Sequence, residues 1–247
     1  MPFASHLAIS IGFFAGILPA VIIVFMTLKE YDDYYEDKHF FLLMVIGLLA
    51  GTMTSLIYYW SILYLSTNLT LLTLLAIIIG FALYEMLLFT IILSMKRFGA
   101  KYDLTYYGVV LGGSIAGVVC MFSIFVFLFN YDLTNQAILS MALLIPTMPL
   151  TYISLSALIG YGISNNQYLK YGIWVVILKS IFNVMFIFWF IGFLYWPDER
   201  GWDLMVFGFV FGILLYWYII RQHLPNSLPE ALRKDMRRKK RRQMLKI

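Results

Sequence analysis

The chain has 247 residues, of which 62% are hydrophobic and 13% are charged, with a formal net charge of +5 at pH 7. Soluble domains are roughly half apolar and about a quarter charged. The composition therefore excludes a soluble globular protein, a disordered chain and a disulfide-rich secreted scaffold. It predicts an all-α, polytopic membrane protein with one transmembrane domain. The single cysteine, Cys120, excludes an internal disulfide.

Seven apolar stretches predict the membrane-spanning helices. A span needs roughly 20 mostly apolar residues, and it must be helical because its backbone N–H and C=O groups find no water in lipid. The stretches that qualify are residues 7–28, 40–64, 71–95, 106–129, 137–163, 171–195 and 203–220. We therefore expect a bundle of about seven transmembrane helices over residues 1–220, followed by a basic cytoplasmic tail over residues 221–247.

The distribution of Lys and Arg predicts the orientation, because cytoplasmic connections are enriched in these residues. With the C-terminus inside, the inner connections hold six of the eighteen and the tail holds ten. Lys179 lies within a span, and only Arg200 lies outside. We therefore expect the N-terminus to lie outside and the C-terminus to lie in the cytoplasm. The membrane that we expect to hold the protein is the plasma (cell) membrane. Aromatic residues predicted to form an outer belt are Tyr58, Tyr59, Trp60, Tyr64, Tyr195, Trp196 and Trp202.

The tail is densely basic between residues 233 and 246. On the cytoplasmic face it is expected to lie against anionic lipid headgroups, at about 1 kcal/mol per basic residue near the surface. The residues expected at the headgroups are Arg237, Arg238, Lys239, Lys240, Arg241 and Arg242. The simplest interpretation is a topology anchor. A ribosome or calmodulin-like contact is a less favoured alternative, and nucleic acid is not an expected partner.

Two ionisable residues lie deep within predicted spans, Glu85 in the third and Lys179 in the sixth. A charge at a membrane helix centre costs at least about 2.5–3.5 kcal/mol, so each is a candidate functional residue. Their depths from the cytoplasmic edge are similar, about 15 Å and about 12 Å. Each is therefore the other's expected partner, and pairing would let both stay charged. Alternatively, the pair binds no ligand and only fixes the register of the third helix against the sixth.

Other polar groups are expected near this pair. Asn183 lies one helical turn beyond Lys179, Tyr84 adjoins Glu85, and Asp103 opens the fourth span near the cytoplasmic edge. In the fifth span, a polar run follows two prolines and comprises Thr151, Tyr152, Ser154 and Ser156. The fourth span carries small residues that predict close helix packing, namely Gly108, Gly112, Gly113 and Gly117. No paired cysteine and no histidine lies within a span, so we expect neither a metal nor another cofactor.

The order of these features resembles the PrsW family of intramembrane proteases, relatives of the CAAX-processing and bacteriocin-immunity membrane proteases. The likeness covers about residues 10–195 and begins with a helix, a polar hairpin and a second helix. GFALYEMLLF (80–89) stands where the family carries Glu-Glu-x-x-Lys. KYDLTYYGVVLGG resembles the family's Asp-Gly-x-x-Tyr-Gly segment and keeps Asp103, Tyr107 and Gly108. Residues 154–164 and 179–186 stand where the family carries two histidines.

The resemblance implies a site in which Glu and His groups activate water through a metal, and this chain departs from it. Of the paired glutamates only Glu85 remains, with Tyr84 in the first position. The lysine position holds Leu88, and the two histidine positions hold Ser156 and Asn183. A general base could survive as Glu85, but the ligands are missing.

Three functions follow from these observations. The first is a PrsW-like homologue that has lost catalysis and uses its membrane cavity to bind a transmembrane segment or partner, since a carboxylate held by Lys179 is a poor general base. The second is an active protease in which Glu85, Ser156, Asn183 and Asp103 converge on one wet cavity. The third is a small transporter with a Glu85/Lys179 relay, although the halves show no internal repeat. A retinal Schiff base at Lys179 is the least favoured interpretation.

Overall fold

The computed structural model describes residues 5–68, 70–98, 102–130, 134–195 and 201–244. All regular secondary structure in these residues is helical. Within this part of the chain, seven helices are long and apolar enough to cross a membrane. They are α1 (Ser5–Leu28), α2 (Asp37–Thr67), α3 (Leu71–Leu93), α4 (Leu104–Asn130), α5 (Asn135–Ser164), α6 (Tyr168–Tyr195) and α7 (Gly201–Tyr218). The predicted all-α bundle is confirmed, and the protein is an integral, multi-pass membrane protein.

Local sequence explains where the helices begin and how their polar residues are accommodated. Thr70 accepts a hydrogen bond from the backbone N–H of Thr73 at the start of α3, and Thr134 caps α5 in the same way. These caps satisfy N–H groups that a first helical turn leaves unpaired. Inside α2, the Ser55 hydroxyl donates to the carbonyl of Gly51. Such bonds satisfy hydroxyls inside a membrane without water.

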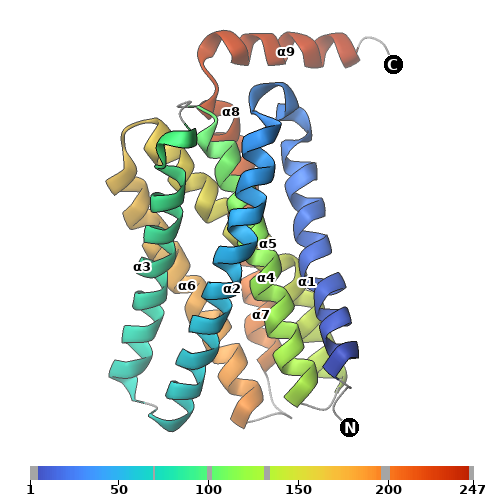
Figure 1. Ribbon diagram of the computed structural model, residues 1–247, viewed down its shortest axis with the longest axis vertical. Helices are drawn as coiled ribbons and strands as arrows, with labels where there is room; N and C mark the ends of the chain where they lie inside the picture. Colours follow the sequence, from blue (N-terminus) through green and yellow to red (C-terminus); the bar gives the residue numbers. More distant parts are fainter. Residues whose placement is uncertain (1–4, 69, 99–101, 131–133, 196–200, 245–247) are drawn as a thin grey trace.

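Short connections gather several segments at the end of the bundle that also carries the C-terminus, which we call the C-terminal end (Figure 1). The connection from α1 to α2 includes the 3-10 helix η1 (Lys29–Tyr34), and the connection from α3 to α4 includes η2 (Lys96–Phe98). The turn from α5 to α6 contains Asn166 with φ 55°, a left-handed conformation that asparagine tolerates well. The N-terminus lies at the opposite end, as an odd number of spans requires.

The seventh span is longer than the sequence predicted. Beyond α7 the helix continues through a π-helical turn, η3 (Ile219–His223), and a short helix, α8 (Leu224–Ser227). The membrane-length helix therefore reaches Ser227 rather than residue 220. The Tyr106 hydroxyl donates to the carbonyl of Leu224 at 3.1 Å, which holds α8 against α4. Helix α9 (Glu230–Met244) follows and lies across the C-terminal end (Figure 1).

Helix α4 forms the centre of the bundle, with α1, α2 and α5 packed around it. Glycines permit this close packing, as predicted. A Cβ on Gly108 would lie 2.4 Å from the carbonyl oxygen of Ser156, and one on Gly112 would lie 2.0 Å from the Ser156 hydroxyl. On the other side, a Cβ on Gly16 of α1 would lie 2.4 Å from the backbone of Met121. These distances are below any van der Waals contact, so α5 and α1 can approach α4 only because these residues lack side chains.

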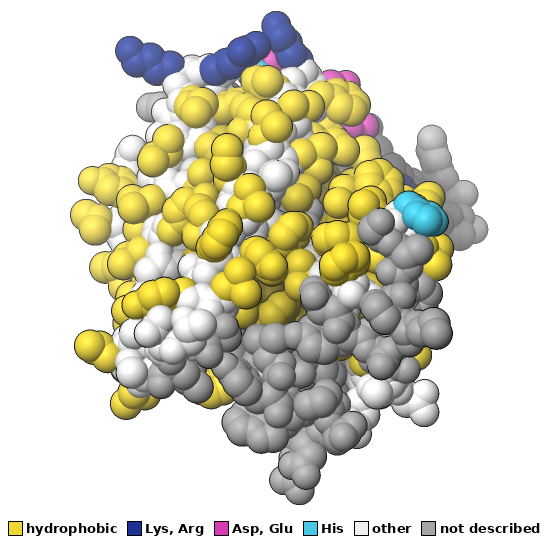
Figure 2. Space-filling model, turned by 60° about the horizontal axis from the view of Figure 1, so that its bottom comes forward, with side chains coloured by type: hydrophobic (Ala, Val, Ile, Leu, Met, Phe, Trp, Pro, Cys, Tyr) yellow, Lys and Arg dark blue, Asp and Glu magenta, His cyan; other side chains and the backbone are white. Residues whose placement is uncertain are grey.

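The outer surface of the helices is apolar, as expected for contact with lipid. Figure 2 shows hydrophobic side chains covering the visible sides of the bundle, with Lys and Arg gathered at the far edge. Large exposed side chains occur on several helices, including Phe14, Leu49, Leu72, Phe207 and Leu214. A surface of this kind is stable only in lipid or against another membrane protein.

The predicted aromatic belt is partly wrong. Trp60 and Tyr64 are exposed on the helix surface, and Tyr59 is partly buried. Tyr58 is instead 4% exposed and points into the bundle, because its hydroxyl has a polar partner there. The side chains of Tyr195, Trp196 and Trp202 lie outside the described part of the structure.

Candidate functional site

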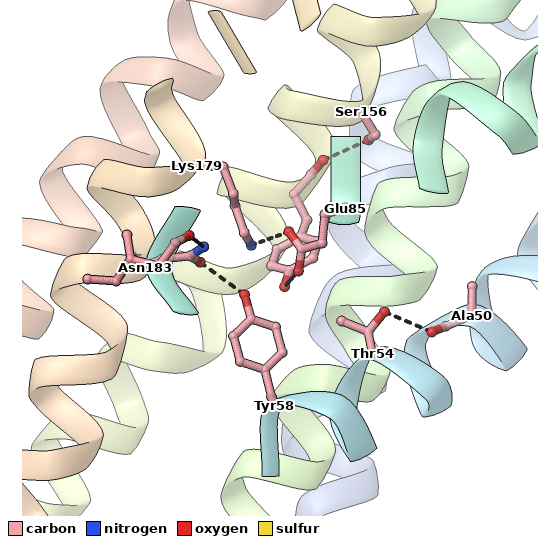
Figure 3. Close-up of polar contacts among 9 residues, drawn as sticks. Ala50, Thr54, Tyr58, Glu85, Ser156, Lys179 and Asn183 are labelled. Carbon is pink, nitrogen blue, oxygen red and sulfur yellow. Dashed lines mark hydrogen bonds and ion pairs between the residues drawn. The ribbon is translucent and has the colours of Figure 1, made fainter. Parts of the chain in front are cut away.

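Glu85 and Lys179 meet in the interior of the bundle (Figure 3). Helix α3 carries the glutamate and α6 carries the lysine, and Glu85 Oε2 lies 2.7 Å from Lys179 Nζ. Both residues are 1% exposed. The predicted pairing of these two side chains is confirmed. A buried pair of this kind keeps each charge from being left alone in a low-dielectric interior, where an isolated ion is very costly.

Tyr152 of α5 completes the surroundings of the pair. Its hydroxyl donates to Glu85 Oε1 at 2.5 Å, and its ring lies beneath the lysine with 3.5 Å between Nζ and the ring centroid. The ring of Phe182 lies 5.0 Å from the same nitrogen. Both carboxylate oxygens are therefore engaged, and the ammonium group gains cation–π contacts in addition to the ion pair. The sequence placed Tyr152 in a polar run but indicated no role for it.

Asn183 lies one turn from Lys179 and has its own partners. Its side-chain oxygen accepts a hydrogen bond from Tyr58 at 2.9 Å, and its side-chain nitrogen donates to the carbonyl of Ile78 at 3.2 Å. Tyr58 is held in place by a stacked contact with Phe81, with 4.0 Å between ring centroids. The amide thus joins α2, α3 and α6. Sequence reasoning missed Tyr58 because it assigned this residue to the aromatic belt.

Ser156 does not contact Glu85 in this arrangement. Its hydroxyl bonds to the carbonyl oxygens of Gly108 and Tyr152, at 2.7 Å and 2.6 Å. One of these carbonyls belongs to α4 and the other to the preceding turn of α5, so the hydroxyl joins the two helices where the glycines let them approach. Gly108 therefore contributes both its carbonyl oxygen and its missing side chain to this contact. Tyr84 is partly buried on α3 beside Glu85.

Asp103 lies away from this cluster, at the C-terminal end of the bundle. It directly precedes α4 and is 5% exposed, and its Oδ1 atom has no hydrogen-bond partner among the described residues. Burial raises the pKa of Asp103 to about 6, and the charge of Glu36 adds to the shift. Tyr107, one turn into α4, accepts a hydrogen bond from the backbone N–H of Glu36 and lies 3.3 Å from Nδ1 of His39. Through Glu36 and His39, Tyr107 joins α4 to the connection between α1 and α2 and to the first turn of α2.

The basic residues predicted to contact lipid headgroups lie in α9. The side chain of Arg238 is 75% exposed, and its Nη1 lies 3.8 Å from Asp235. The side chains of Arg237, Lys239, Lys240, Arg241 and Arg242 lie outside the described part of the structure.

A narrow crevice lies beside the Tyr58–Asn183 contact. It separates α2 from α6 above the surface of α4, encloses about 20 Å³, and is lined by Tyr58, Tyr59, Phe122, Ser123 and Phe186 among others. Tyr59 and Phe122 are only partly buried, so the mouth of the crevice lies on the lipid-facing surface. A space of this size holds about one water molecule and no helix.

The residues around Glu85 do not fit a metal site. Lys179 and Tyr152 contact the carboxylate, and the described residues contain no group of three or more His, Cys, Asp and Glu that could hold a metal ion. Asn183 and Ser156 stand where the resemblance places histidine ligands, and both are already bonded to protein groups. The chain matches no protein-family model, no curated protein and no solved structure.

Proposed function

We propose that this protein is a non-catalytic PrsW-like membrane protein that binds a transmembrane segment of a partner protein. The observation that carries the proposal is the set of contacts that the Glu85 carboxylate makes. Both of its carboxylate oxygens are bonded, one to Lys179 and one to Tyr152, inside a site that is closed to solvent. A general base needs a water molecule at a free lone pair, whereas this carboxylate is 1% exposed and its neighbours are the Lys179 ammonium group and the Tyr152 hydroxyl.

The proposed loss of catalysis is also supported by the other predicted site residues. Hydrolysis through an unusual site would need Ser156, Asn183 and Asp103 to face the same water-filled space as Glu85. Instead, Ser156 bonds to backbone carbonyls, and Asn183 bonds to Tyr58 and Ile78. Asp103 directly precedes α4 at the C-terminal end of the bundle, away from Glu85. The active-protease alternative therefore finds less support, and so does a carrier, since neither charge is exposed.

The proposed binding surface is the crevice between α2 and α6. It is the place where a polar cluster comes close to the lipid-facing surface, because Tyr58 both lines the crevice and bonds to Asn183. Ser55 and Ser123 supply small side chains on the facing helices. Membrane helices associate through close packing at small residues and through hydrogen bonds across the interface. A partner helix that packs over the mouth of the crevice would gain both kinds of contact.

The catalytic part of the proposal is tested with purified protein in detergent micelles. Bound zinc is measured by elemental mass spectrometry, and cleavage is measured on membrane-anchored reporter proteins. We expect no stoichiometric zinc, and no cleavage by either the wild type or Glu85→Gln. Chelator-sensitive cleavage by the wild type that disappears in Glu85→Gln would contradict the proposal.

The binding part is tested by photocrosslinking in intact membranes. Phe122, at the crevice, and Phe207, a 65% exposed residue of α7, are each replaced by p-benzoylphenylalanine, so that one aromatic side chain replaces another. We expect a discrete crosslinked membrane protein from position 122 and none from position 207. Equal crosslinking from the two positions would indicate unspecific contact with neighbours and would exclude this surface.

A further inference from the structure

A second pocket lies between α6 and α7 near the C-terminal end of the bundle, on a surface that the Glu85 site does not use. It encloses about 370 Å³. Its polar lining consists of Lys170, Tyr171, Tyr218 and His223, and Trp174, Leu178 and Leu215 belong to its apolar lining. The volume falls within the range of small-molecule sites, and a few polar groups above an apolar wall are typical of such sites.

The π-helical turn of η3 places His223 in this pocket. A π-turn adds a residue to one helical turn, and such turns are frequent at functional sites. His223 is 8% exposed and lies among three tyrosine rings, with 4.6 Å to the centroid of Tyr161, 5.1 Å to Tyr218 and 5.8 Å to Tyr171. Its Nδ1 atom has no hydrogen-bond partner among the described residues. A buried polar group without a partner is uncommon in proteins and indicates that something else supplies the bond.

The charge at the mouth of the pocket is positive. Lys170 is exposed, and its ammonium group lies 5.7 Å from the ring centroid of Tyr171. It forms no ion pair within the described chain, and no acidic side chain lines the pocket with it. A ligand that complements this lining carries a negative charge at the level of Lys170.

The apolar part of the pocket continues from this charge into the membrane. Trp174 and Leu178 follow Lys170 by one and two turns of α6, so they lie below it on the same helix face. Trp174 is 52% exposed, and this exposed surface faces lipid. The order of charge, polar rings and apolar wall along the groove is that of a phospholipid from phosphate to acyl chain.

We propose that the α6–α7 groove is a binding site for one anionic phospholipid. The phosphate lies between the Lys170 ammonium group and the His223 imidazole, and an acyl chain packs along Trp174 and Leu178. Basic pockets between membrane helices near the surface bind anionic lipid headgroups by the same combination of charge and fit. The site is separate from the tail in α9, which would attract such lipids without a pocket.

Native mass spectrometry of the purified full-length protein tests this site. Delipidated protein is titrated with phosphatidylglycerol, with phosphatidylcholine of the same acyl chains, and with inorganic phosphate. The background is a full-length variant with glutamine at positions 237–242, which removes most of the charge of the tail. We expect one phosphatidylglycerol per protein, weaker binding of phosphatidylcholine and no retained phosphate. Equal binding of the two lipids, or retention of inorganic phosphate alone, would overturn the proposal.

Matched variants locate the bound lipid. Lys170→Gln and His223→Gln are each expected to weaken phosphatidylglycerol binding by about fivefold, the effect of one charge or strong donor near a headgroup. Lys96→Gln removes an exposed lysine at the same end of the bundle and is expected to leave the affinity unchanged. A photoactivatable phosphatidylglycerol should label the peptide that contains residues 168–178. Unchanged affinity in Lys170→Gln and His223→Gln, or labelling confined to other helices, would exclude the groove even if one variant folded poorly.

Discussion

At the scale of single residues, the interior of this bundle is organised by one acid and one amine that no water can reach. The ion pair between Glu85 and Lys179 offsets the cost of burying both charges, and Tyr152 contacts both side chains. Buried pairs of this kind often add little net stability over an apolar pair, yet removing one partner is costly because the other is left alone. This difference provides a way to measure what the pair contributes.

The pair predicts a strong coupling between two substitutions. Lys179→Met should destabilise the protein by about 3–5 kcal/mol, because it leaves the carboxylate of Glu85 buried without a counter-charge. The double variant with Glu85→Gln should recover most of this loss, since glutamine still accepts the hydrogen bond from Tyr152. Thermal or denaturant unfolding in micelles of the wild type, both single variants and the double variant measures the coupling. Additive effects would show that the two side chains do not interact as the structure describes.

Asp103 predicts a dependence of stability on pH. Its pKa is raised from 3.8 to about 6 in the folded protein, so the folded state holds a proton more tightly than the unfolded state. Stability therefore falls as pH rises from about 4 to about 6, and the loss is complete above pH 6. Allowing for partial solvent screening, the loss amounts to about 1–2 kcal/mol.

The substitution Asp103→Asn should remove this dependence. We expect the variant to unfold at a higher temperature than the wild type at pH 7.5 and at nearly the same temperature at pH 4.5. Asp235→Asn, which removes an exposed acid of α9, serves as the control and should follow the wild-type curve at both values. A wild-type protein that becomes more stable between pH 4.5 and 6, with the increase lost in Asp103→Asn, would reverse the assigned sign.

At the scale of elements, the position of α4 against its neighbouring helices depends on glycine residues. Helices α4 and α5 are in close contact at Gly108 and Gly112, and the same contact takes up the hydroxyl of Ser156. Because Tyr152 lies one turn before Ser156 on α5, the separation of these helices also decides where the tyrosine hydroxyl meets Glu85. Packing between two helices therefore positions a polar contact to a third.

Alanine substitutions separate packing from helix propensity. Gly108→Ala and Gly112→Ala should each destabilise the bundle by about 1–3 kcal/mol, because the new methyl group has no space beside α5. Gly80→Ala is the matched control, since a Cβ there meets nothing within 4 Å. It should be neutral or stabilising by up to about 1 kcal/mol, because alanine favours helix over glycine. Unfolding temperatures in micelles compare the three variants, and equal effects at all three positions would contradict the close packing.

At the scale of the whole molecule, seven spans place the two ends of the chain on opposite sides of the membrane. The C-terminal end carries η1, η2 and α9, and fourteen of the fifteen Lys and Arg residues in the described part of the chain belong to segments at this end. Such an asymmetry favours retention of this end in the cytoplasm during insertion. The basic helix α9 would then lie where the surface potential of the membrane attracts it.

Reporter fusions test this orientation. A green fluorescent protein fused after Ile247 should fluoresce, because it folds in the cytoplasm and not after export in the unfolded state. An alkaline phosphatase inserted after Asn68, between α2 and α3, should be active because that connection is expected outside. The opposite pair of signals would reverse the orientation and would place α9 away from the cytoplasmic leaflet.

The amino-acid sequence was sufficient to predict the seven spans and the pairing of Glu85 with Lys179. Both follow from rules that need no knowledge of helix packing. Apolar segments of this length must be helical in lipid, and opposite charges at the same depth in a membrane are expected to pair because an unpaired charge there is costly. The helix packing was needed to show that Tyr58 faces inward, that Tyr152 bonds to Glu85, that Ser156 bonds to backbone, and that Asp103 lies away from this cluster. These helices are apolar on all sides, so their sequences carry little information about which face turns inward. The rotation of each helix is set by how closely its neighbours can approach, and that depends on residues far apart in the chain.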